Sequence, residues 1–253
     1  MKQFFCIFLI LVTNIFTACS TVRNTPLSNA SPTNPINTPQ STESVEIDYM
    51  TSSCTKDSVD EFFNAAEKIE GDSLLSGVSF EKEHCYNVTP PAISAVTDYK
   101  IFKFDNSDAS IILINGQIYN LCSSFGGYGF VNAAPWDYDN DGNIDLLVAS
   151  SWGSGLHRSE ISIFNTKTKK STIIYDTLKA DNPQVDLIIT SSSVPSFSSK
   201  PLTDILENIE YMVSYADIEF NNENSADLKY TATGVAGTVI LENGKPVFKS
   251  ANK

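Results

Sequence analysis

The nine residues "DYDNDGNID", numbered 137–145, bring four carboxylates into one short segment: Asp137, Asp139, Asp141 and Asp145. Like charges this close destabilise a fold unless something neutralises them. Carboxylates at positions 1, 3, 5 and 9 converge on one point when the chain wraps around it, and Gly142 at position 6 permits the sharp turn. The carbonyl of Asn143 at position 7 adds a further oxygen. The pattern therefore predicts a metal-binding loop.

Calcium is the metal that this ligand set favours. Ca²⁺ takes several hard oxygen ligands in flexible geometry, whereas Mg²⁺ demands a tighter octahedron and keeps its waters. The loop is not an EF-hand, because position 12 is Val148 instead of a bidentate Glu and "IDLLVAS" is typical of a strand. We expect the ion to be structural. The alternative is a solvated acidic turn without metal.

The stretch "WDYDNDGNIDLLVASSWGSG" resembles the FG-GAP or VCBS repeat, whose pattern is D-x-D-x-D-G-x-x-D-L followed by a strand. Every acidic position, the glycine and the Leu after the last Asp match. The resemblance covers about residues 125–165. It implies a β-propeller with calcium bound between strands, and a role in recognition or adhesion.

The fold class predicted for the folded part is mainly β. Alternating apolar residues and the two-residue turns Asn115–Gly116 and Asn243–Gly244 indicate antiparallel hairpins. A short N-terminal helix is expected within 54–72, with Val59, Phe62 and other apolar residues on its core face. We expect a β-propeller-like or repeat-containing antiparallel domain. A β-sandwich carrying one calcium loop is the alternative.

A spacing of 41 residues separates three similar strand beginnings, "DLLVAS" at Asp145, "DLIITS" at Asp186 and "DLKYTA" at Asp227. Short strands at such a period are typical of propeller blades. Chance similarity is the alternative, because an Asp before two apolar residues is a common pattern.

The N-terminus predicts export. Residues 1–18 have one Lys and then an apolar run too short to span a bilayer, and they resemble a bacterial lipoprotein signal with "FTAC" as its lipobox. The resemblance implies cleavage before Cys19 and lipid on that residue, which anchors the protein to the membrane on the extracytoplasmic side. Residues 19–45 are rich in Ser, Thr, Asn and Pro, so we expect a disordered tether before a globular body at 46–253.

Net charge, histidine content and cysteine content limit the kinds of ligand and disulfide that we expect. A net charge of −13 argues against nucleic acid and suits divalent cations or neutral partners such as glycans. The chain has two histidines and no CxxC spacing, which argues against a zinc site. Cys54, Cys85 and Cys122 allow at most one disulfide in a monomer, and its pairing stays open between Cys54–Cys85 and three buried thiols.

The stretch "SSWGSGLHRSE" follows the strand after the acidic loop. Trp152, His157 and Arg158 are candidates for a recognition patch that stacks on a sugar or grips a peptide; the alternative is a packed glycine-rich loop. The G-x-S-x-G pattern is not satisfied, and no catalytic residue is assigned.

We therefore predict a surface-anchored calcium-binding recognition or adhesion module. An extracellular hydrolase acting on glycans or peptides and a structural surface protein without ligand are the alternatives.

Overall fold

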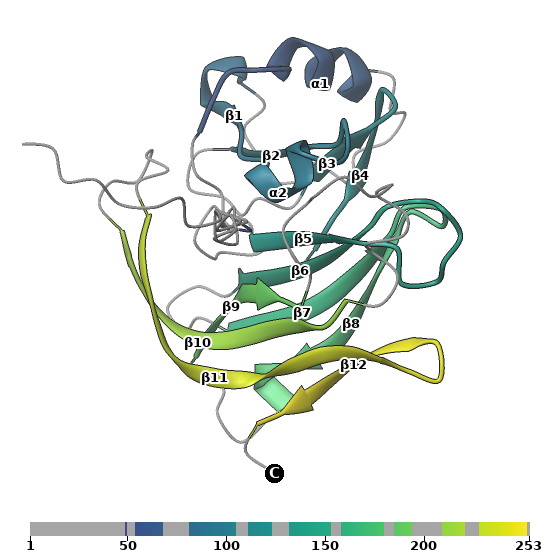
Figure 1. Cartoon of the computed structure of the whole chain (residues 1–253). Coiled ribbons are helices and arrows are strands. Elements are labelled where there is room, and N and C mark those ends of the chain that lie inside the picture. The colour runs from purple at the N-terminus through teal and green to yellow at the C-terminus, as the bar shows by residue number, and fades with distance from the viewer. Residues whose placement is uncertain are drawn as a thin grey trace, which may run out of the picture. The chain divides into compact units, whose positions relative to one another are not determined.

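The computed structural model (Figure 1) describes residues 49, 54–67, 81–104, 111–122, 132–152, 158–179, 185–193, 209–220 and 228–251. All of these residues belong to one compact unit, Glu43–Lys253. The expected signal, the lipidated Cys19 and the tether lie outside the described residues. None of the described helices is long and apolar enough to cross a membrane.

Three four-stranded antiparallel sheets make up most of the described structure. The first sheet consists of β1 (Cys85–Asn87), β2 (Lys100–Phe104), β3 (Ile111–Ile114) and β4 (Gln117–Asn120). The second consists of β5 (Asn132–Trp136), β6 (Asp145–Trp152), β7 (Arg158–Asn165) and β8 (Lys170–Asp176). The third consists of β9 (Asp186–Ser192), β10 (Tyr211–Phe220), β11 (Leu228–Glu242) and β12 (Lys245–Ser250).

The described helices are few and short: α1 (Val59–Ala66), α2 (Pro91–Ser94) and the 3-10 turns η1 (Lys82–His84) and η2 (Thr177–Lys179). The prediction of a mainly β domain with a short N-terminal helix is therefore confirmed. In each sheet, strands that follow one another in the chain pair with one another. Each sheet is therefore an antiparallel meander.

Strands β5, β6 and β7 of the second sheet are buried, whereas β8 is exposed or partly buried. Leu146 and Val148 of β6 belong to an apolar cluster shared with Ile101 and Ile112 of the first sheet. The alternate residues of β6, Leu147 and Ala149, belong to a cluster shared with the third sheet. Because successive side chains of a strand point to opposite faces, burial on both faces requires the unbroken apolar run of β6.

Two hairpins form as the sequence predicts. Asn115 and Gly116 connect β3 and β4 with φ of 51° and 70°, and Asn243 and Gly244 connect β11 and β12 with φ of 54° and 72°. Two consecutive positive φ angles define a type I′ turn, whose twist matches that of the flanking strands.

The predicted core face of α1 is confirmed at Val59 and Phe62, which are buried. The Phe62 ring lies 4.6 Å from the Phe102 ring of β2, centroid to centroid. The helix therefore covers the face of the first sheet that points away from the second sheet.

The 41-residue spacing does not relate equivalent strands. Asp145 begins β6, the second strand of its sheet, whereas Asp186 begins β9, the first strand of the next sheet. Asp227 lies outside the described residues, immediately before β11, the third strand of that sheet. The repeated strand openings thus fall at three different places in the meanders.

The structure contains no disulfide among Cys54, Cys85 and Cys122. Cys85 lies in the cluster under α1, and Cys122 lies in the cluster between the first two sheets. Burial raises the pKa of the Cys85 thiol to about 12, which keeps it protonated and unreactive at neutral pH.

Gly237 is the glycine of the third sheet that a side chain would disrupt. A Cβ placed there would lie 2.6 Å from Cζ of Phe248 and would also meet the backbone carbonyl of Lys249. We expect Gly237→Ala to lower the free energy of unfolding by about 1–3 kcal/mol, because a tightly packed site must shift to admit the methyl group. Urea unfolding measures the change.

Gly234→Ala is the matched control, because a Cβ at that position of the same strand meets no atom within 4 Å. Equal stabilities of the two variants would show that β11 and β12 do not pack as closely as the structure has them.

Candidate metal centre

The acidic loop connects β5 to β6 across an antiparallel pair. Trp136 and Asp145 face each other as the last pair of the ladder, and the loop turns between them. Asn140 and Gly142 have positive φ, 54° and 80°. Asn and Gly are the residues that tolerate this conformation best, so the local sequence fits the tight turn that the spacing of carboxylates requires.

The loop brings three of the predicted ligands together. One carboxylate oxygen from each of Asp137, Asp139 and Asp141 lies within 4.8 Å of the other two. In the described part of the chain, this is the group of His, Cys, Asp and Glu side chains that meets the geometry of a metal centre. Asp145, also predicted as a ligand, is not a member of this group. The backbone carbonyl of Asn143 stays a predicted ligand.

Asp137 organises the loop from inside. Its side chain is buried, and its two oxygens accept hydrogen bonds from the backbone N–H groups of Asp141 and Gly142, both at 3.0 Å. Each carboxylate oxygen has a second lone pair, so these bonds leave acceptor capacity for a cation.

Asp141 is held by its neighbour two residues along. The backbone N–H and the side-chain amide of Asn143 both donate to Oδ1 of Asp141, at 2.9 and 2.8 Å. These bonds and the nearby Lys167 ammonium lower the pKa of the Asp141 carboxyl. The amide nitrogen of Asn143 is thus committed to Asp141.

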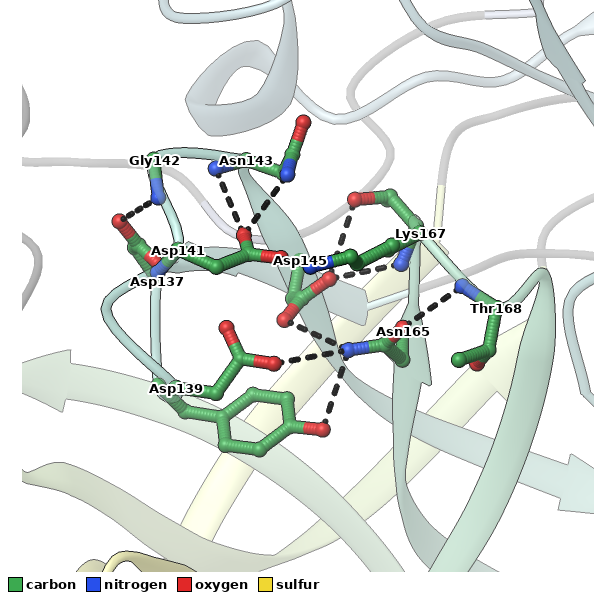
Figure 2. Close-up of polar contacts among 11 residues, drawn as sticks. Asp137, Asp139, Asp141, Gly142, Asn143, Asp145, Asn165, Lys167 and Thr168 are labelled. Carbon is green, nitrogen blue, oxygen red and sulfur yellow. Dashed lines mark hydrogen bonds and ion pairs between the residues drawn. The ribbon is translucent and has the colours of Figure 1, made fainter.

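Asp145 is bound by the turn between β7 and β8. Its Oδ1 accepts bonds from the backbone N–H of Thr166 at 2.6 Å and from the Thr166 hydroxyl at 3.0 Å. Its Oδ2 accepts a bond from the Asn165 amide at 3.3 Å. The carboxylate is fully buried, so three donors from one turn satisfy it (Figure 2).

Asn165 links the buried carboxylate to the exposed part of the loop. Its Oδ1 accepts the backbone N–H of Thr168 at 2.8 Å, which turns Nδ2 toward the acidic side chains. Nδ2 lies 3.3 Å from Asp145, 3.4 Å from Asp139 and 3.1 Å from the Tyr138 hydroxyl. Two amide hydrogens are therefore shared among three acceptors.

Asp145 carries an unusual pKa. Burial, which is the largest cause, and the negative charges of Asp139 and Asp141 together raise it from 3.8 to about 6, although the hydrogen bonds from Thr166 oppose the rise. The loop therefore holds a carboxyl that resists ionisation because its surroundings are apolar and already negative.

The sequence analysis did not identify the partners in the β7–β8 turn. Asn165 and Thr166 bind Asp145, and the Lys167 ammonium lies 3.1 Å from Oδ2 of Asp141. No motif marks these residues. The register of β6 with β7, in which Leu146 pairs with Phe164, is what brings this turn to the acidic loop.

The predicted recognition patch lies at the other end of β6. Trp152 ends the strand and pairs with Arg158, which is partly buried, while His157 lies outside the described residues. At about 3.3 Å per residue, Trp152 is roughly 23 Å along the strand from Asp145. The structure therefore brings Trp152 and Arg158 together, and it separates both from the acidic loop.

Comparisons with known proteins returned no match: no family model fits the chain, and neither the curated proteins nor the solved structures include a significant match.

The donor set fits a hard divalent cation. Three carboxylates supply oxygen ligands, and among the described residues no Cys or His side chain belongs to the group. Oδ2 of Asp141 is closed to solvent and accepts no hydrogen bond from the described residues, although it is in an ion pair with Lys167. Asp137, Asp139 and Asp141 are the residues that would hold a metal ion.

The pKa of Asp145 predicts a pH-dependent stability in EDTA. The folded state holds the proton more tightly than the unfolded state, so this group makes the free energy of unfolding fall as pH rises from about 4 to about 6. Asp145→Asn cannot ionise and removes this contribution. Urea unfolding of both proteins at four pH values between 4 and 7 should show the wild type losing stability relative to the variant.

A difference between wild type and Asp145→Asn that is constant over this pH range would contradict the raised pKa. Asp217→Asn, at an exposed carboxylate of β10, is the control for the loss of one carboxylate.

Proposed function

We propose that the loop at 137–145 is a calcium site whose ion is structural, in a surface-anchored lipoprotein that serves recognition or adhesion. The observation that carries the calcium site is the convergence of the Asp137, Asp139 and Asp141 carboxylate oxygens within 4.8 Å. A convergence of this kind favours a bound cation, because the charges repel one another without one.

Calcium is supported over other cations by the kind of ligands and by their flexibility. All three acids offer hard oxygens, and Asp139 is exposed on a turn that can adjust to a large ion. Extracellular calcium modules bind at roughly 0.1–1 mM, which suits a site outside the cell.

A structural role follows from the position of the loop. It joins β5 to β6, two buried strands of the second sheet. An ion that fixes the loop couples its order to this pair of strands, and binding energy then adds to folding energy.

The recognition role rests on the sequence. Residues 125–165 resemble the FG-GAP or VCBS repeat, which occurs in adhesion and recognition proteins. A lipid on Cys19 followed by a polar tether would display the globular body at a surface. A glycan or a protein is the expected ligand, since the net charge of −13 does not suit nucleic acid.

Thermal melts in calcium, magnesium and EDTA test the site. At about 5 mM calcium, an affinity near 0.5 mM stabilises by about 1.4 kcal/mol, which raises Tm by roughly 3–6 °C for a domain of this size. We expect this rise in calcium, a smaller rise or none in magnesium, and no rise for Asp139→Asn. Asp139 is the best choice because its side chain accepts one long hydrogen bond from the described residues, 3.4 Å from Asn165, so the metal-free fold loses little.

The control for the melts is Asp217→Asn, which should keep the calcium response of the wild type. Identical Tm values for the wild type in all three buffers would remove the proposed calcium site.

Cells that express the full chain test the recognition role. We expect them to adhere, in calcium, to some members of a panel of immobilised glycans and peptides, and to lose adhesion in EDTA or with Asp139→Asn. Cys19→Ser should release the protein from the membrane and abolish adhesion as well. Adhesion equal to that of cells without the protein would contradict the recognition role, and retention of Cys19→Ser on the membrane would contradict the anchor.

A further inference from the structure

Lys167 places a positive charge on the acidic loop from a different hairpin. Its ammonium lies 3.1 Å from Oδ2 of Asp141. Asp141 is the largest cause of the raised pKa of Lys167, and Asp139 adds to it, so the lysine is attracted by two of the three clustered acids.

The Lys167 ammonium contacts Oδ2 of Asp141, the oxygen to which Asn143 does not donate. Asn143 donates twice to Oδ1, whereas Oδ2 accepts no hydrogen bond in the described structure and is closed to solvent. The lysine therefore neutralises the oxygen of Asp141 that has the greater capacity left for a cation.

Resting on the calcium site proposed above, we propose that Lys167 is a built-in competitor for that site: its ammonium occupies Asp141 when no metal is bound, and a divalent cation must displace it. The competition lowers the affinity for calcium, so the loop fills only at the higher calcium concentrations found outside cells.

The structure allows the lysine to leave without loss of the turn. The Lys167 side chain is 67% exposed, so its ammonium can move into water. The turn is held by other bonds, namely those of Thr166 and Asn165 to Asp145 and that of Thr168 to Asn165. Displacement of Lys167 therefore exchanges one ion pair for hydration and leaves the buried bonds intact.

Calorimetric titration of the full chain with calcium chloride tests the proposal in four proteins: the wild type, Lys167→Met, Lys167→Arg and Lys170→Met. Lys170 is the matched control, because it is an exposed lysine at the start of β8, directly after the same turn, and its loss removes the same net charge. We expect Lys167→Met to bind calcium roughly two- to fivefold more tightly than Lys170→Met, the range that a partly exposed ion pair supplies. Lys167→Arg keeps the charge and should bind like the wild type.

Each outcome decides between the two proposals. If all four proteins bind calcium and Lys167→Met binds no more tightly than Lys170→Met, the competitor role is wrong and the calcium site stands. Weaker binding by Lys167→Met would show that the lysine supports the site, which also overturns competition. If none of the four binds calcium, the proposed calcium site fails and the competitor role fails with it.

Discussion

The carboxylate of Asp145 is buried where β6 begins, and three donors from the β7–β8 turn bind it. This contact joins two hairpins whose residues are about 20 positions apart in the chain. Without it, a charged group would be left unpaired in the interior, which costs far more than one exposed hydrogen bond. The rest of the acidic loop is built outward from this point, since Asn165 continues from Asp145 to Asp139.

Burial of β6 on both faces also limits where polar residues can lie along the strand. β6 is apolar on both faces because the second sheet packs against both of its neighbours, so its two ends are the places where polar chemistry can gather. At one end the acidic loop gathers three carboxylates, and at the other end Trp152 pairs with Arg158. A calcium ion at the first end would stabilise the sheet, while a ligand at the second end would meet a surface roughly 23 Å away.

Much of this arrangement follows from the sequence. The spacing of "DYDNDGNID" predicted the turn and the convergence of Asp137, Asp139 and Asp141, because the period of the acids and Gly142 are local features. The two Asn–Gly turns and the apolar run of β6 were predictable for the same reason. Asn165, Thr166 and Lys167 were not predictable, because their role depends on the register of β6 with β7. The raised pKa of Asp145 was not predictable either. The spacing predicts that Asp145 is a ligand like the other three aspartates, and its burial, which raises the pKa, is known only from the structure.

A crystal structure of the protein grown in calcium tests the central claim most directly. The account predicts one ion with Asp137, Asp139 and Asp141 among six to eight oxygen ligands at about 2.3–2.6 Å, and the bonds from Thr166 to Asp145 still in place. A loop without an ion at saturating calcium, with Lys167 still paired to Asp141, would contradict the claim that these acids form a calcium site.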